Sequence, residues 1–201
     1  DCKAYIADSA ETLQASMNAI ATATDTVVIE IEKDIDLSTI TYAQPSPNAK
    51  TIVINGNENT ISGMTVSLFG VITKSNITVN DLYIDGAVIT GEATMDDYAG
   101  VFGVDASSIS GSNYAFDNVH VKATVTSKKY AGGFIGYIGN DQSSSSATAT
   151  NNATITNCSF EGTITGGGSV GAVVGHNYAN LTVTGFEVKA GSTIECTEDR
   201  G

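Results

Sequence analysis

The chain has 201 residues and a net charge of −13, with 15% charged residues, 21 glycines and two prolines. This length suits one domain with a sizeable core. The excess of acidic groups would repel a phosphate backbone, which excludes nucleic acid as a partner. No apolar run approaches the roughly 20 residues of a membrane span, so we expect no membrane insertion. Low charge with abundant Thr, Val and Ile favours strands over helices.

Residues 9–23 predict a helix. Leu13, Met17 and Ile20 recur at helical spacing, and Ser9 and Thr12 are available as N-caps. An amphipathic helix of about three turns would cover the open apolar end of a stack of strands. We therefore assign residues 1–26 to an N-terminal capping helix segment and residues 27–201 to strands, in a single domain overall.

Six segments between residues 29 and 189 repeat one pattern of an alternating strand, a two-residue polar corner and usually a second alternating strand. Alignment puts apolar residues in one column: Ile31, Ile54, Val79, Phe116, Ile155 and Val183. The corner column holds residue types that tolerate left-handed backbone angles: Asp34, Gly56, Asp81, Asn118, Asn157 and Gly185. One outward column alternates in charge, as stacked strands would favour: Asp85, Lys122, Glu161 and Lys189.

A short apolar motif ends in glycine four times, as SLFG, GVFG, GFIG and AVVG, at Gly70, Gly103, Gly136 and Gly175. Each copy precedes the next aligned strand pair, so we expect a short inward strand with a glycine corner. A phosphate loop is excluded because GxxxxGK[ST] and a following helix pattern are missing. Extra residues in the longer repeats, at 91–98, 107–113 and 139–152, predict loops that protrude on one side.

Together these patterns predict an all-β fold, a right-handed single-stranded parallel β-helix (solenoid) of about six coils. The chain resembles right-handed parallel β-helix proteins over roughly residues 27–195. Its GVFG, GFIG and AVVG elements are similar to the GLUG motif of bacterial surface and secreted proteins, which include surface-anchored peptidases and adhesin-like proteins. The resemblance implies an extracellular or cell-surface location within a larger surface protein, and it carries no catalytic residues across.

Parallel β-helices often host carbohydrate-cleaving enzymes, so acidic side chains near the first long loop are candidates for catalysis. A glycosidase needs two carboxylates that face one cleft, and Asp96, Asp97 and Asp105 lie close together in the sequence. The same three acids fit a solvated loop equally. A polysaccharide lyase is disfavoured because it needs cationic residues, and the one arginine lies in the tail.

Aromatic side chains near the predicted corners are the candidates for ligand binding: Tyr98, Tyr130, Tyr137, His176 and Tyr178. His176 follows a glycine at a corner, so it fits either a sugar site or a plain turn. The alternation places His120 on the surface and Cys158 in the core. We expect no cofactor or metal. Calcium would suit the acidic, Asn-rich loops, but no EF-hand loop or GGxGxDxUx repeat is present.

The function we expect is that of a non-catalytic extracellular module, adhesin-like, which displays loops that bind a glycan or a host or cell-surface protein. The first alternative is a carbohydrate-active enzyme, either a polysaccharide hydrolase or a lyase. The second is a structural spacer within a larger surface protein. Converging carboxylates in a cleft would favour the enzyme, and exposed tyrosines on one face would favour binding.

Overall fold

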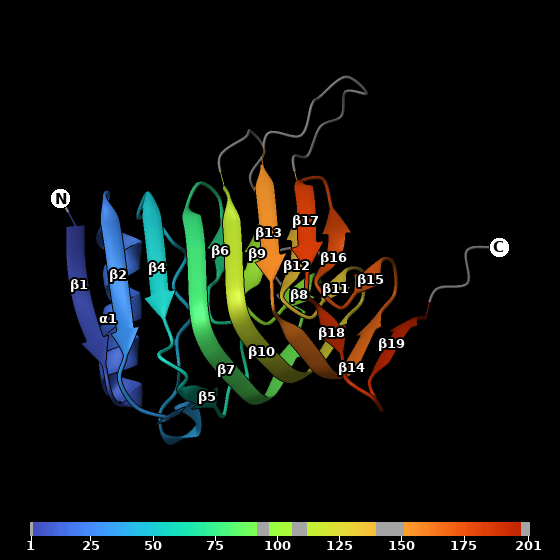
Figure 1. Cartoon of the computed structure of the whole chain (residues 1–201), viewed down its shortest axis with the longest axis horizontal. Coiled ribbons are helices and arrows are strands. Elements are labelled where there is room, and N and C mark those ends of the chain that lie inside the picture. Colours follow the sequence, from blue (N-terminus) through green and yellow to red (C-terminus); the bar gives the residue numbers. More distant parts are fainter. Residues whose placement is uncertain (1, 92–96, 106–111, 140–150, 198–201) are drawn as a thin grey trace.

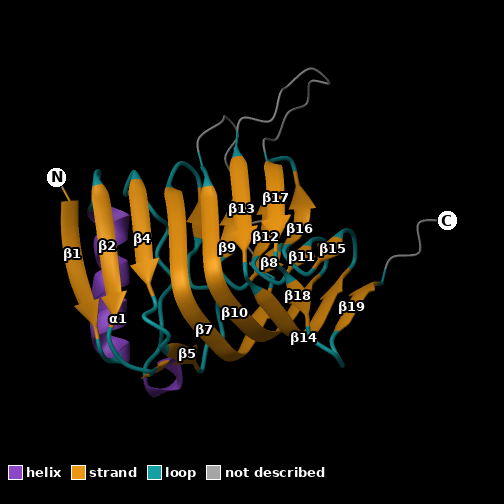
Figure 2. Cartoon of the chain, in the orientation of Figure 1, coloured by secondary structure: helices purple, strands orange, loops and turns teal. Residues whose placement is uncertain are grey.

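The computed structural model describes residues 2–91, 97–105, 112–139 and 151–197 (Figure 1). A twelve-stranded sheet runs the length of the molecule in the order β1–β2–β4–β7–β10–β13–β17, with β3, β5, β14, β18 and β19 attached to this path (Figure 2). Its strands are β1 (Cys2–Ala7), β2 (Thr26–Ile31), β3 (Ile35–Asp36), β4 (Thr51–Asn55), β5 (Thr60–Ser62), β7 (Asn76–Thr90), β10 (Tyr114–Ser127), β13 (Asn152–Thr156), β14 (Ser159–Gly166), β17 (Asn180–Thr184), β18 (Glu187–Val188) and β19 (Thr193–Cys196). All described strand pairs are parallel.

Two smaller sheets complete the β-structure. The four-stranded sheet contains β6 (Val71–Ile72), β9 (Gly103–Asp105), β12 (Ile135–Ile138) and β16 (Val174–Asn177). The three-stranded sheet contains β8 (Ala99–Gly100), β11 (Ala131–Gly132) and β15 (Val170–Gly171). The prediction of a single-stranded β-helix of about six coils is therefore wrong, because the strands form separate parallel sheets of unequal size that do not close into one solenoid.

The N-terminal region explains this difference. Strands β1 and β2 have no counterparts in the smaller sheets, whose first strand, β6, follows β4 and β5 in the chain. A helix, α1 (Ala10–Thr22), packs beside β1 and β2 instead (Figure 1). Its apolar stripe of Leu13, Met17 and Ile20 is fully buried, and an amphipathic helix can cover a sheet face without further strands.

The predicted helix is thus present, and its N-terminus is a capping box in which Ser9 and Thr12 satisfy each other's backbone N–H groups. Its position differs from the prediction. Strands β1 and β2 pair in parallel on either side of it in the sequence, so α1 is the crossover of a βαβ unit. Strand β1 was not predicted, because its apolar Ile6 faces outward and is exposed, which breaks the alternation of apolar and polar residues.

The predicted register is confirmed through most of the large sheet. Residues Ile54, Val79, Phe116, Ile155 and Val183 neighbour one another across β4, β7, β10, β13 and β17. We call such a set of laterally adjacent residues a column. In β2 the column continues to Ile29 instead of Ile31. The predicted alignment of the first segment was therefore wrong by two residues.

The predicted corners take left-handed backbone angles at four of the six positions, with φ of 50°, 53°, 52° and 66° at Asp81, Asn118, Asn157 and Gly185. Asp34 and Gly56 do not. The side chain of Asp34 accepts a hydrogen bond from the Thr60 N–H at 2.7 Å. At the other corner the left-handed angles fall on the two residues after Gly56.

The repeated glycine motif lies where β8 and β11 meet β12 and β16. The predicted glycine corner is wrong for Gly136 and Gly175, which lie inside β12 and β16 and are flanked by paired residues of the two strands. Gly103 begins β9 and pairs with Ile135. A Cβ added to Gly100 would lie 2.3 Å from the backbone nitrogen of Gly136. These glycines therefore allow two backbones to approach closely. The predicted protruding loops lie mainly outside the described residues.

Candidate functional site

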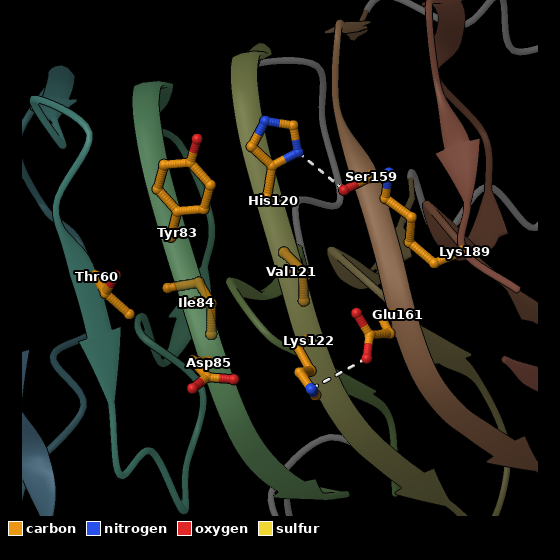
Figure 3. A pocket seen from close by; sticks show the side chains of 10 residues that line it. All are labelled: Thr60, Tyr83, Ile84, Asp85, His120, Val121, Lys122, Ser159, Glu161 and Lys189. Atoms are coloured by element: carbon orange, nitrogen blue, oxygen red, sulfur yellow. Dashed lines mark hydrogen bonds and ion pairs between the residues drawn. The ribbon is translucent and has the colours of Figure 1, made fainter. Parts of the chain in front are cut away.

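A groove of about 500 Å³ opens on the outer face of the large sheet (Figure 3). It crosses β5, β7, β10 and β14 and ends at Lys189, directly after β18. Because side chains alternate across a strand, two outward columns supply its polar lining. The first contains Thr60, Tyr83, His120 and Ser159, and the second contains Asp85, Lys122, Glu161 and Lys189.

An aromatic pair forms one part of the groove wall. The rings of Tyr83 and His120 stack with centroids 5.0 Å apart and an interplanar angle of 29°. The residue opposite Tyr83 on its other side is Thr60, which carries no ring. The tyrosine is 39% exposed, so the ring face turned away from His120 is available to a ligand.

Hydrogen bonds fix the orientation of the imidazole. His120 Nε2 lies 3.0 Å from Oδ1 of Asn118, and Nδ1 lies 2.8 Å from the hydroxyl of Ser159. Asn118 donates its Nδ2 to Asp81 at 2.7 Å, which leaves its carbonyl oxygen to accept from His120. The neutral imidazole therefore carries its proton on Nε2 and accepts the Ser159 hydroxyl proton at Nδ1.

The second column carries alternating charges. The ammonium of Lys122 lies 3.0 Å from the Glu161 carboxylate, and the hydrogen bond and charge of Glu161, with the charge of Asp85, raise the lysine pKa. Lys189, directly after β18, forms an ion pair with Glu187 of that strand. Such exposed pairs add about 0–1 kcal/mol of stability. Their main consequence is that the base of the groove carries hydrogen-bond donors and acceptors in fixed positions.

The environment of His120 favours the neutral imidazole. Partial burial lowers its pKa below the ordinary value of 6.5, the Lys189 ammonium lowers it further, and Glu187 opposes this. The unfolded chain therefore binds more protons than the folded protein as the pH falls past about 6.5. We expect the free energy of unfolding to decrease on acidification through this range, and the decrease to be smaller in His120→Gln. Urea unfolding between pH 7.5 and 5.5 measures both, and an identical pH slope in the variant would contradict this assignment.

A second cluster contains all five side chains predicted to bind a ligand. The Tyr130 ring stacks against the rings of Tyr98 and His176, with centroid distances of 4.7 and 4.4 Å. Tyr137 stacks beside all three at 5.1 to 5.8 Å, and Tyr178 contacts His176 edge-on at 4.9 Å. Sequence reasoning thus selected residues that meet in space, although His176 lies in strand β16 and is not a plain turn residue.

The packing of this aromatic cluster limits what it can bind. The Tyr130 ring stacks against the rings of Tyr98, His176 and Tyr137, and Tyr98 is buried. The Lys129 ammonium lies 5.3 Å from the ring centroids of both Tyr98 and Tyr130, a favourable cation–π distance. Tyr178 is exposed, so a ligand would meet the cluster at this ring and at ring edges.

The acids proposed for catalysis do not form a site among the described residues. Asp97 lies in an ion pair with Lys128 at 3.4 Å. Asp105 is fully buried and accepts a hydrogen bond from the Tyr114 hydroxyl at 2.6 Å. Burial, followed by the charge of Asp105, raises the pKa of Tyr114. Asp96 lies outside the described residues. A buried carboxylate tied to a core tyrosine cannot contact a polysaccharide at the surface.

We compared the chain with known proteins. No family model matches it, and no curated protein matches it. Its fold is similar to a crystal structure at 1.30 Å described as that of a "putative immunoglobulin A1 protease" from Bacteroides ovatus, with a TM-score of 0.56 and 15% sequence identity. The similarity covers 92% of this chain and 66% of that one. At this identity the likeness is one of fold.

Three further observations concern metals, cysteines and membranes. Among the described residues, no group of three or more His, Cys, Asp or Glu side chains could hold a metal ion. Cys2, Cys158 and Cys196 form no disulfide with one another, and Cys158 is buried as predicted, which raises the pKa of its thiol. Within the same residues no helix has the length and apolarity to cross a membrane.

The sequence analysis did not identify the groove, although the two outward columns that line it can be aligned from the sequence. The columns through Tyr83 and Asp85 were aligned correctly, and the outward position of His120 is confirmed. Two features of the spatial arrangement could not be predicted from the sequence pattern. Thr60 lies beside Tyr83, and a bulge at Gly86, with φ of 68°, shifts the register of β7 against β10 next to the charged column.

Proposed function

We propose that this chain is a non-catalytic extracellular or cell-surface module that binds a glycan in the groove of the large sheet. The observation that carries the proposal is the available face of Tyr83 above a row of ionic and hydroxyl side chains. A sugar ring presents C–H groups on one face and hydroxyls around its rim. An aromatic ring suits the face, and fixed polar groups suit the rim.

The charges of the groove indicate which glycans fit. Lys122 and Glu161 neutralise each other, as do Lys189 and Glu187, so the floor offers charged donors and acceptors with little net charge. Such a surface favours uncharged sugars, whose hydroxyls both donate and accept, over highly sulfated chains, which the protein's overall charge of −13 also repels.

A glycan array followed by calorimetry on the captured sugars tests the proposal. We expect Tyr83→Ala to weaken binding at least about tenfold, or about 1.4 kcal/mol, because the stacking surface is removed. Tyr178→Ala is the matched control, an exposed aromatic side chain outside the groove. If Tyr178→Ala loses binding and Tyr83→Ala does not, the ligand lies at the aromatic cluster instead. If no glycan is captured, the spacer function is favoured.

A second candidate function, hydrolysis of the bound glycan, is favoured by two carboxylates in the same groove. Asp85 and Glu161 lie on strands that flank β10, so their backbones are about 10 Å apart at the usual strand spacing. Inverting glycosidases hold their carboxyl groups about 6.5–9.5 Å apart. Reducing-sugar release from a captured glycan, lost in Asp85→Asn, would support hydrolysis. Capture without release supports the binding module.

A further inference from the structure

A serine, a histidine and an asparagine in the groove form one chain of hydrogen bonds. The Ser159 hydroxyl lies 2.8 Å from Nδ1 of His120, and Nε2 of the same ring lies 3.0 Å from Oδ1 of Asn118. Asn118 in turn donates to the Asp81 carboxylate at 2.7 Å. A hydroxyl, a base within hydrogen-bond reach and a third group that orients the base are the parts of an activated serine nucleophile.

The strands hold these side chains in place. Ser159 begins β14 and is the lateral neighbour of His120 in β10. Asn118 occupies the left-handed corner of β10, with φ of 53°, two residues before the histidine. Ser159 lines the groove although it is only 6% exposed. A ligand in the groove therefore reaches the hydroxyl, while bulk water has little access to it.

The surroundings of the imidazole suit both states that a proton transfer needs. Partial burial and the Lys189 ammonium lower the pKa of His120, so Nδ1 is available as a base near neutral pH. Once it has taken a proton, the imidazolium lies against the Tyr83 ring, at a centroid distance of 5.0 Å, where a cation is favoured. Its Nε2–H donates to Asn118, whose amide is polarised by Asp81.

We propose that Ser159 is a nucleophile that accepts the acyl group of an ester carried by a ligand in the groove. Oγ of Ser159 forms a bond to the carbonyl carbon, and the hydroxyl proton moves to Nδ1 of His120. The bond between the carbonyl carbon and the ester oxygen then breaks, and His120 returns the proton to the departing oxygen. The products are an acyl-serine and a free hydroxyl on the ligand, so no other reactant is needed.

Lys189 is the cation on the side of Ser159 away from His120. It pairs with Glu187, the lateral neighbour of Ser159 in β18, and its side chain points toward Ser159 in Figure 3. A cation beside the carbonyl oxygen stabilises the negative charge that develops there. Glu187 offsets part of this positive charge, so we expect one slow acylation per chain and not rapid turnover, which agrees with a module that binds its ligand.

The ligand class is an O-acylated glycan, an assignment that rests on the proposed function. Thr60, beside the open face of Tyr83, and Ser159 are three strands apart, about 14 Å at the usual strand spacing. The sugar that stacks on Tyr83 and the sugar that carries the ester are therefore different units of one chain. An ester is uncharged, as a groove whose ion pairs leave little net charge favours.

Acetylation by p-nitrophenyl acetate tests the nucleophile without a glycan, so its failure is separate from a failure of glycan binding. We expect mass spectrometry of peptides from the treated wild-type chain to find an acetyl group on Ser159. Ser159→Ala should remove this acetylation, and His120→Gln should slow it at least about tenfold. Ser169→Ala is the matched control and should change nothing at Ser159, because the Ser169 hydroxyl lies 3.3 Å from a different histidine, His176.

The pH dependence separates a base from a purely structural histidine. The rate of acetylation at Ser159 should rise as His120 loses its proton below pH 6.5 and stay level from about pH 7 to 8. Acetylation only at lysines or other serines, an equal rate in His120→Gln that is folded by circular dichroism, or a rate that keeps rising above pH 7 would each overturn the proposal. If p-nitrophenyl acetate labels Ser159 but a captured O-acetylated glycan does not, the assignment to a glycan ester is overturned.

Discussion

Replacement of Phe134 by alanine should lower the free energy of unfolding by about 3–5 kcal/mol, the usual cost of removing a buried aromatic side chain. Phe134 is fully buried. Its ring contacts Phe102, Phe116 and Phe186 at centroid distances of 5.6, 5.3 and 5.9 Å. These residues come from different parts of the chain, so the truncation leaves a cavity that no single strand can close by moving.

Urea or thermal unfolding followed by circular dichroism measures this effect. Tyr178→Ala is the control, because an exposed aromatic side chain should change the free energy of unfolding by about 0.5 kcal/mol or less. A loss below 1 kcal/mol in Phe134→Ala would show that the interior is loosely packed. It would also remove the basis for treating the outer face as a rigid platform for a ligand.

The register of the large sheet could be predicted because one face of each strand is buried. A slip of one residue in the strand register would turn Val79, Phe116 and Ile155 out of the core. The apolar pattern of the sequence therefore specifies the register. The corner residues add a second, independent signal, since Asn118 and Asn157 occupy angles that few other residue types tolerate. Both signals are local or depend on simple alternation.

The closure of the sheets could not be predicted in the same way. Alternation tells which side chains point inward, but it does not tell what covers them from the opposite side. Here α1 covers β1 and β2, while short strands cover the later part. Strand β1 itself, with Lys3 on the inner side and Ile6 on the outer side, lacks the expected pattern, so the parallel pairing across the helix had no signal.

The candidate site was likewise predictable only in part from the sequence. The five aromatic residues chosen from the sequence meet in space, but choosing them required no knowledge of ring orientation. Tyr137 and His176 are lateral neighbours in β12 and β16, and the other rings stack against them. Their faces are therefore largely used within the protein. In the groove, Tyr83 keeps one face open because its neighbour Thr60 is small, a fact that depends on register between distant segments.

Substitution of alanine at Gly136 should be at least as damaging as loss of the core phenylalanine. Gly136 is buried in β12, and its backbone angle is not left-handed, so the cost arises from contact and not from conformation. A Cβ at this position would lie 2.4 Å from the carbonyl oxygen of Ala99 and 2.6 Å from its carbonyl carbon. Both are backbone atoms within paired strands, so they cannot move without breaking the ladder between β8 and β11.

The matched control is Gly86→Asn, at the bulge in β7. Gly86 has a φ of 68°, and nothing lies within 4 Å of an added Cβ. Because asparagine tolerates left-handed angles, this variant should lose about 1 kcal/mol or less. We expect Gly136→Ala to lose more than about 3 kcal/mol or to fail to fold, as judged by thermal unfolding and near-ultraviolet circular dichroism. If both variants were equally stable, the repeated glycine motif would not serve close backbone approach, and its recurrence in the chain would need another cause.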